Sequence, residues 1–270
     1  MPVYAKARDT RGEIAGEVEG RTPFKTHAFV NSISTVMTAD PELHRALMRT
    51  FVRRTVVSLV LVGVLLFGAA GTLNWPEAWL YLALAAAISF GAGSWMARND
   101  PALLAERLRS PFQREQKPWD KAVMAVMMAL WIGWLVVMGL DVRYHWSDVP
   151  TILKAAGFVL IVLGSYVVGL TFKANSYAAP VVKIQTGRGH AVATNGPYAY
   201  VRHPMYAGAL FFFVGVPLLL GSWWGLAAAP ALVLIIALRA VLEERTLAAE
   251  LDGYADYAAR VRYRFVPYLW

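Results

Sequence analysis

Long apolar runs alternate with short polar segments over most of this chain. Four runs are clearly bounded, at residues 55–73, 78–97, 122–140 and 152–172. Each is close to the roughly 20 residues that an α-helix needs to cross the hydrocarbon core of a bilayer. The pattern therefore predicts four transmembrane helices.

A fifth apolar region, residues 205–238, is too long for one span. Gly215 and Pro217, and then Gly221 and Ser222, interrupt it. These residues favour turns and helix ends. We expect two shorter helices joined by a tight turn, a hairpin that starts and ends on the same side of the membrane.

Two polar segments flank the first spans. Asp40, Pro41 and Glu42 read as a helix start with Asp40 as the N-cap. That helix is either an interfacial one or a plain extension of the first span, and the sequence leaves both open.

Residues 99–101 start another short helix before the third span. There we expect Leu103, Leu104 and Leu108 to rest on the bilayer. Arg107 and Arg109 would then face water.

Composition and charge agree with a membrane protein. Apolar residues make up 57% of the chain, whose formal net charge is +8. Of the 26 Lys and Arg residues, 24 lie in segments 1–54, 98–121, 173–205 and 239–270, all on one side of the expected membrane. The positive-inside rule puts this side and both termini in the cytoplasm. Membrane insertion already explains these charges, so they do not indicate nucleic-acid binding.

Cysteine is absent, and the five histidines show no ligand spacing, so no metal site is predicted. Polar chemistry concentrates instead around the hairpin. Residues 195–208 place Arg202 and His203 directly before Pro204, which suits the first position of a helix. We expect both residues to cap that helix, whose N-terminus is a natural seat for an anionic group.

Glu243 and Glu244 follow the last apolar helix, and the hairpin returns them to the membrane face where Arg202 lies. Adjacent helical residues point about 100° apart, so the two carboxylates cannot face the same pocket. One is expected to meet a ligand or Arg202, the other to pair with Arg239 or an arginine of the tail. A purely structural ion network stays open as an alternative.

Taken together, the block 196–208, the Glu243-Glu244 pair and the Tyr254-x-x-Tyr257 tail resemble the isoprenylcysteine carboxyl methyltransferase family and its phospholipid N-methyltransferase relatives. The resemblance covers roughly residues 173–270 and points to a bacterial-type member. It implies an all-α integral membrane helical bundle, with about four transmembrane helices, a C-terminal helical hairpin and a cytoplasmic pocket for S-adenosylmethionine.

The resemblance also implies roles for individual residues. Arg202 and Glu244 are the expected catalytic residues. Asn175 and Gln185 are expected to bind substrate for a different reason: they are uncharged polar residues that follow the end of the fourth span. Residues that match the family's motifs, and are expected to bind the cofactor, are Tyr198, Arg202, His203, Tyr206, Glu243, Glu244, Tyr257 and Arg262. Gly208 matches too, but as a close-packing position in the hairpin.

The expected activity is methyl transfer to a lipidic or lipid-linked acceptor at a bacterial inner membrane. The chain divides into a cytoplasmic N-terminal segment (1–50), a transmembrane region (51–172) and a catalytic region (173–270), with no obligate protein partner. One alternative is an NADPH-dependent sterol or steroid reductase, since those membrane enzymes carry a similar His-Pro-x-Tyr element. Another is a transporter or scaffold, for which polar residues would be expected at mid-membrane.

Overall fold

The computed structural model describes residues 41–270, and their regular structure is entirely helical. Five helices are long and apolar enough to cross a membrane: α2 (Pro41–Ala70), α3 (Pro76–Asn99), α5 (Pro118–Tyr144), α6 (Thr151–Ala174) and α8 (Trp223–Glu250). A shorter apolar helix, α7 (Pro204–Leu220), stands between α6 and α8. The prediction of an all-α, multi-pass bundle with a C-terminal hairpin is confirmed.

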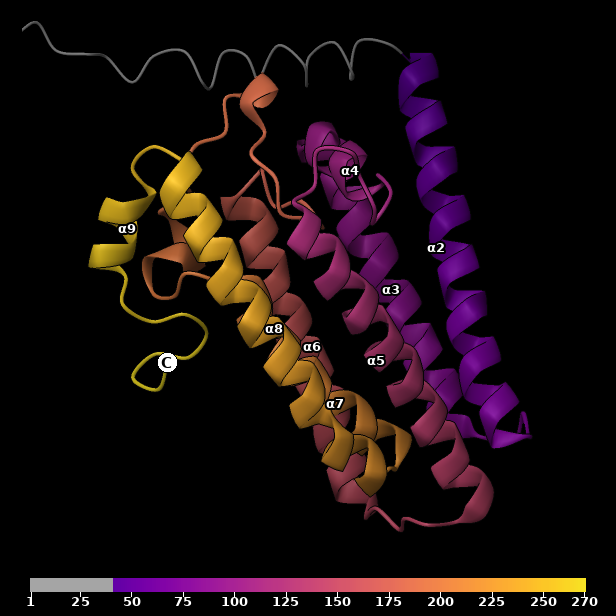
Figure 1. Cartoon of the computed structure of the whole chain (residues 1–270). Coiled ribbons are helices and arrows are strands. Elements are labelled where there is room, and N and C mark those ends of the chain that lie inside the picture. Colours follow the sequence, from indigo (N-terminus) through magenta and orange to yellow (C-terminus); the bar gives the residue numbers. More distant parts are fainter. Residues whose placement is uncertain (1–40) are drawn as a thin grey trace, which may run out of the picture.

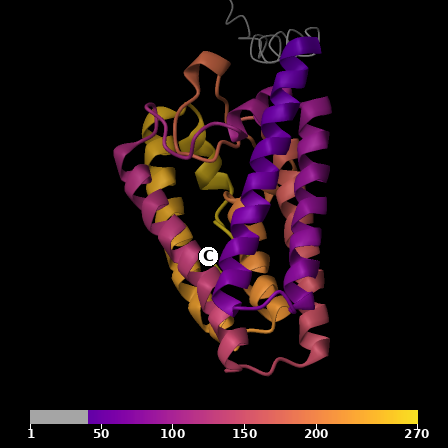
Figure 2. The ribbon, with the colours of Figure 1, turned by 90° about the vertical axis from the view of Figure 1, so that its right-hand side faces the viewer.

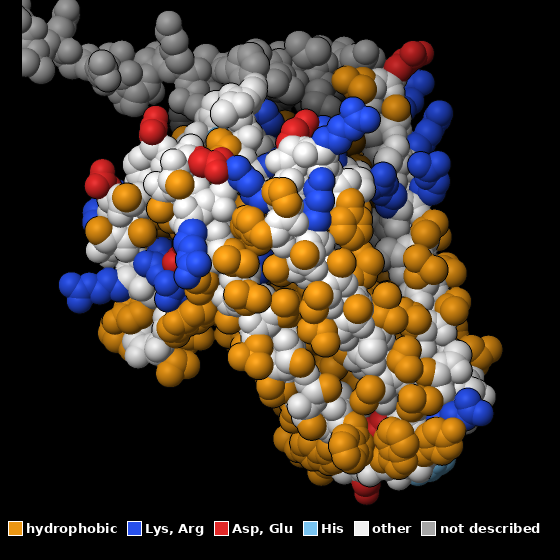
Figure 3. All heavy atoms as spheres, in the orientation of Figure 1, with side chains coloured by type: hydrophobic (Ala, Val, Ile, Leu, Met, Phe, Trp, Pro, Cys, Tyr) orange, Lys and Arg blue, Asp and Glu red, His pale blue; other side chains and the backbone are white. Residues whose placement is uncertain are grey.

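The long helices lie side by side, and the short elements gather toward one end of the bundle (Figures 1 and 2). These short elements are α4 (Pro101–Arg107), η1 (Thr186–Arg188), η2 (Gly196–Ala199) and α9 (Tyr254–Arg260). Lys and Arg side chains collect over the same end, above a broad apolar surface (Figure 3). Such a surface suits lipid tails, so the described helices have the polarity that the sequence predicts.

Helix α2 is continuous from Pro41 to Ala70. The stretch before the first span is therefore an extension of that span rather than a separate interfacial helix. Asp40, its expected N-cap, lies outside the described residues. The division of the chain at residues 50 and 172 stays a prediction.

Helix α4 differs from its expected position. Its N-cap is Asp100, whose side chain accepts a hydrogen bond from the Leu103 backbone N–H at 2.9 Å. Leu103 and Leu104 are almost fully buried and pack in a cluster with Phe172 of α6. The prediction that these leucines rest on the bilayer is wrong, because α4 folds against the bundle and its apolar face is covered by protein.

The hairpin turns at Gly221, which ends α7 with a φ of 79°, and Ser222, whose side chain caps α8. Pro217 stays inside α7, so only the second pair of expected breakers interrupts the apolar region. Asp141, at the end of α5, accepts a hydrogen bond from the Ser222 hydroxyl. This bond ties the turn to the neighbouring span.

Helices α6 and α7 approach each other closely through glycines. A Cβ on Gly157 would lie 2.6 Å from the Gly215 carbonyl oxygen, and one on Gly164 would lie 2.8 Å from that of Gly208. Only glycine permits such contact between backbones. Gly208 is thus a close-packing position, as expected, but its neighbour is α6 rather than the other arm of the hairpin.

Candidate active site

A cavity of about 330 Å³ lies among the short elements at the basic end of the bundle. Its walls come from α4, α5, the segment 175–193, η2, the start of α7, the end of α8 and α9. Seven of the predicted site residues line it: Asn175, Tyr198, Arg202, His203, Tyr206, Glu243 and Tyr257. Polar residues from distant parts of the sequence therefore share one cavity.

The C-terminal tail closes one side of the site through backbone contacts. The N–H of Arg202 donates to the Tyr263 carbonyl and that of His203 to the Arg264 carbonyl, both at 2.9 Å. The Tyr257 hydroxyl donates to the Tyr198 carbonyl at 2.8 Å. These bonds hold the loop before α7 against the chain that follows α8.

Glu244 binds three cationic or ionisable side chains at once. Its carboxylate oxygens lie 2.7 Å from Arg202 Nε, 3.1 Å from His203 Nε2 and 3.0 Å from Arg264 Nε. Glu244 itself is not among the residues that line the cavity. His203 occupies the N-cap position of α7, but its side chain makes no capping bond.

Glu243 faces a different direction from its neighbour and lines the cavity. Its Oε2 accepts a hydrogen bond from the Tyr206 hydroxyl at 2.9 Å, and that hydroxyl accepts one from Arg239 at 2.8 Å. The two glutamates thus divide as their helical spacing requires. Glu244 joins Arg202 and the tail, and Glu243 presents a carboxylate to the cavity.

Asp120, in the first turn of α5, anchors the wall behind Tyr206. It is fully buried and lies 2.8 Å from Arg239 Nε. Its Oδ2 also accepts the backbone N–H of Val182 at 2.9 Å. Sequence reasoning did not single out Asp120, because an acidic residue in the first turn of a helix is common.

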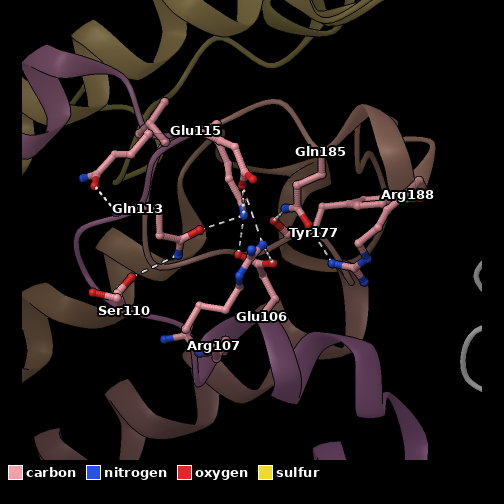
Figure 4. Close-up of polar contacts among 12 residues, drawn as sticks. Glu106, Arg107, Ser110, Gln113, Glu115, Tyr177, Gln185 and Arg188 are labelled. Carbon is pink, nitrogen blue, oxygen red and sulfur yellow. Dashed lines mark hydrogen bonds and ion pairs between the residues drawn. The ribbon is translucent and has the colours of Figure 1, made fainter. Parts of the chain in front are cut away.

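Of the two predicted substrate-binding residues, only one lines the cavity. Asn175 lines the cavity, and its Nδ2 donates to the Tyr198 hydroxyl at 2.9 Å. Gln185 is buried outside the cavity lining, where it donates to the Tyr177 carbonyl and accepts from Arg188 (Figure 4). Gln185 therefore braces the segment that carries Asn175.

A second polar cluster braces the loop between α4 and α5. Lys183 Nζ lies 2.7 Å from Glu106 and 2.8 Å from Gln113, and Figure 4 shows Glu106, Gln113 and Glu115 around this point. Burial acts to raise the pKa of Glu106, but Lys183 and Arg109 outweigh it and hold that pKa below its usual value. The cluster joins the segment 175–193 to α4.

His190 also lines the cavity, with its ring 4.8 Å from that of Tyr177. Burial, and secondarily Arg188, lower the pKa of His190 to about 4. The imidazole is therefore neutral near pH 7 and adds no positive charge to the site.

Two arginines lie in positions that differ from the sequence prediction. Arg262, in the tail, is exposed and does not line the cavity. Arg107, expected to face water, does line it. A sequence signal for this existed: Arg107 follows Leu103 and Leu104 by four and three positions, so it shares their helix face. Once that face packs against the bundle, Arg107 must point inward as well.

Comparisons with known proteins agree with the resemblance. Residues 152–251 match the family model described as phospholipid methyltransferase. A protein-S-isoprenylcysteine O-methyltransferase from Schizosaccharomyces pombe is 26% identical over 139 residues, which cover 45% of this chain and 59% of that protein. The chain thus spans less than two thirds of the length of this curated relative.

A solved structure of the eukaryotic intramembrane Ras methyltransferase, isoprenylcysteine carboxyl methyltransferase, superimposes with a TM-score of 0.47 and 18% sequence identity. The superposition covers 88% of this chain and 86% of that one. The family match and the curated relative both agree with the predicted resemblance to these membrane methyltransferases.

Proposed function

We propose that this chain, a relative of the isoprenylcysteine carboxyl methyltransferases and the phospholipid methyltransferases, is itself an S-adenosylmethionine-dependent methyltransferase. Its acceptor is a lipidic or lipid-linked molecule that reaches the cavity from the cytoplasmic side of the membrane. The observation that carries this proposal is the single cavity shared by Tyr198, Arg202, Tyr206 and Glu243. All four lie within the matched region, although more than 35 residues separate Tyr206 from Glu243.

The cavity fits such a methyl donor in size and in the polar groups it leaves without partners. Ligand pockets typically enclose about 300–1,000 Å³. Within residues 41–270, the buried Tyr254 hydroxyl has no hydrogen-bond partner, and Glu243 Oε1 receives no hydrogen bond. Buried polar groups are normally satisfied, so the Tyr254 hydroxyl is suited to a polar group of a nucleoside or amino acid. The Glu243 carboxylate, which is partly exposed and lines the cavity, can accept a hydrogen bond from a hydroxyl or amino group.

S-adenosylmethionine, when bound, supplies an electrophilic methyl group on a sulfonium. The task of this chain is then to align the acceptor with that group and to exclude water, which is an orientation effect. Tyr206 and His203, whose rings stack at 5.3 Å, form a wall for this purpose. A carboxylate or thiolate acceptor needs no base, whereas an amine or hydroxyl acceptor needs one.

An apolar groove beside the cavity supports a lipidic acceptor. It encloses about 540 Å³ between α6, α7 and the tail, and Leu160, Leu210, Phe211 and Phe265 are among the residues that line it. Pro204 lines both the groove and the cavity. An acyl or prenyl chain in the groove would bring its polar head to the start of α7.

The basic end of the bundle supports a cytoplasmic orientation for the site, since Lys and Arg are retained on that side of a membrane. We extend this to a bacterial inner membrane, with both termini in the cytoplasm. The transporter and scaffold readings have less support, since the polar cavity lies at one end of the bundle rather than midway along it.

The reductase alternative is less well supported. An NADPH site needs several basic groups for the nucleotide phosphates. Four Lys and Arg side chains line the cavity, and three of them, Lys183, Arg202 and Arg239, already have a carboxylate partner within 2.8 Å. Only Arg107 among these four is left for a phosphate. The sequence matches also favour methyl transfer over hydride transfer.

The first test is isothermal titration of the purified, detergent-solubilised protein with S-adenosylhomocysteine and, separately, with NADPH. We expect only the former to bind. Glu243→Gln should weaken that binding by about tenfold, the cost of one hydrogen bond to a charged group. Glu250→Gln, on the same helix but outside the cavity lining, is the matched control. Binding of NADPH alone would favour the reductase.

The acceptor is identified by incubating membranes that contain the protein with methyl-labelled S-adenosylmethionine and then separating lipids from proteins. We expect the label in a lipid or lipid-linked fraction. Label in soluble small molecules alone would contradict this part of the proposal.

A further inference from the structure

The cationic side chains that line the cavity are not equally engaged. Three of the four have a carboxylate partner. The charged atoms lie 2.7–2.8 Å apart in each pair: Lys183 with Glu106, Arg202 with Glu244, and Arg239 with Asp120. These pairs are already neutralised, so they offer little to a negatively charged ligand.

Arg107 is the exception. Its Nη1 donates one hydrogen bond, to the Ala178 carbonyl at 2.9 Å, and its guanidinium lies 4.5 Å from the centre of the Phe172 ring. Within residues 41–270 it forms no ion pair, and most of its N–H groups have no acceptor. Burial lowers the pKa of Arg107 to about 10, which still leaves it charged at pH 7.

Arg107 is partly buried, and an unpaired guanidinium there is costly, because a charge taken out of water needs a partner to offset the lost hydration. Arg107 lines the ligand cavity, so a bound anion can be that partner. Guanidinium binds carboxylate with two parallel hydrogen bonds, which adds geometric selectivity to the charge attraction.

Glu243 supplies a negative charge to the same cavity. Both Glu243 and Arg107 affect the pKa of the Tyr198 hydroxyl. Burial is the main cause that raises this pKa. Glu243 raises it further, whereas Arg107 acts to lower it. The two opposite charges therefore lie within electrostatic range of one cavity residue. Arg107 is a cation without a carboxylate partner, and Glu243 has one carboxylate oxygen that receives no hydrogen bond. Together they are complementary to an α-amino acid, which carries a carboxylate and an ammonium group.

We propose that Arg107 binds the carboxylate of the amino-acid part of the methyl donor, with Glu243 near its ammonium group. This inference rests on the proposed function. It assigns the role to a residue of α4, outside residues 152–251 that match the family model. Arg202, the residue that motif reasoning favours for this role, is instead occupied by Glu244.

The test compares two ligands by isothermal titration: S-adenosylhomocysteine and its decarboxylated analogue, which differs only in lacking the carboxylate. We expect the analogue to bind the unaltered protein about 10–100-fold more weakly, as for the loss of a charged, bidentate contact. Arg107→Gln should weaken S-adenosylhomocysteine by a similar factor. The same variant should change the affinity of the analogue by less than about threefold.

Arg107→Lys keeps the charge but not the planar fork, so its affinity for S-adenosylhomocysteine should lie between those of the unaltered protein and Arg107→Gln. Arg109→Gln is the matched control, because Arg109 is half exposed and lies outside the cavity lining. The comparison of the two ligands on the unaltered protein needs no variant, so it stands even if Arg107→Gln does not fold.

Equal affinity of the unaltered protein for both ligands would overturn the assignment of Arg107 but leave the proposed function intact. So would an Arg107→Gln variant that binds S-adenosylhomocysteine normally and loses only affinity for the acceptor, since the anion would then belong to the acceptor. Failure of the unaltered protein to bind either ligand would instead count against the proposed function itself.

Discussion

At the scale of single residues, the site depends on which way each charged side chain points. Glu243 and Glu244 are chemically identical neighbours, yet one lines the cavity and the other holds Arg202, His203 and Arg264. The motif identifies both residues but does not show that their side chains make different contacts. We therefore regard Glu244 as a positioning residue that acts through Arg202 and the tail.

This division predicts a large structural effect at Glu244. Glu244→Gln leaves three basic side chains with a neutral partner. Losing one member of a fully buried ion pair costs about 3–5 kcal/mol, and because Glu244 and its partners are partly exposed, the loss here should be smaller than that but more than about 1 kcal/mol. We expect a lower midpoint of thermal unfolding and faster tryptic cleavage within residues 260–264, where the tail loses its contact.

The control is Glu250→Gln, which removes the pair with Lys117 at 2.6 Å. Both of those side chains are partly exposed, so the loss should be no more than about 1 kcal/mol. If the two variants unfold alike and resist trypsin alike, the network around Glu244 does not hold the tail.

At the scale of helices, the contact between α6 and α7 positions the site. The loop that carries Asn175 leaves the end of α6, and Arg202 lies two residues before the start of α7. The spacing of these two helices therefore controls the width of the cavity. Two glycine pairs set that spacing, Gly157 with Gly215 and Gly164 with Gly208.

Gly164→Ala should destabilise the protein by about 1–3 kcal/mol, as overpacking typically does, because its Cβ would meet the Gly208 carbonyl oxygen at 2.8 Å. It should also weaken binding of S-adenosylhomocysteine, since α7 has to move. Thermal unfolding in detergent and isothermal titration measure the two effects.

Gly169→Ala, on the same helix, is the matched control, because a Cβ there has no atom within 4 Å. Alanine favours helix more than glycine does, by about 1 kcal/mol, so this variant should be neutral or slightly more stable. Equal destabilisation by both variants would mean that the glycine contacts do not matter.

At the scale of the whole molecule, charge orients the bundle. The short elements and most Lys and Arg side chains share one end, and three connections lie at the other: residues 71–75, 145–150 and 221–222. By the positive-inside rule, this distribution of charge supports the proposed cytoplasmic orientation of the site.

Because the chain has no cysteine, single substitutions report its orientation directly. Thr72 follows α2 and Thr186 begins η1, and both are exposed. The connection between α2 and α3 and the segment between α6 and η2 lie at opposite ends of the bundle (Figure 1). In spheroplasts of a bacterial expression host, a membrane-impermeant maleimide should label Thr72→Cys at once. Thr186→Cys should be labelled only after lysis, and the reverse pattern would place the site outside the cytoplasm.

The sequence alone determined the helical class, the spans and the hairpin, because each follows from local hydrophobicity and turn residues. It also identified Tyr198, Arg202, Tyr206 and Glu243 through motifs that stay recognisable without a fold. Only the tertiary structure decided that Arg107 lines the cavity and that Gln185 and Arg262 do not. It also decided that Glu244 binds Arg202 and the C-terminal tail. The reason is physical: hydrophobicity acts on each segment separately, whereas the partner of a buried charge depends on which distant segments pack against it.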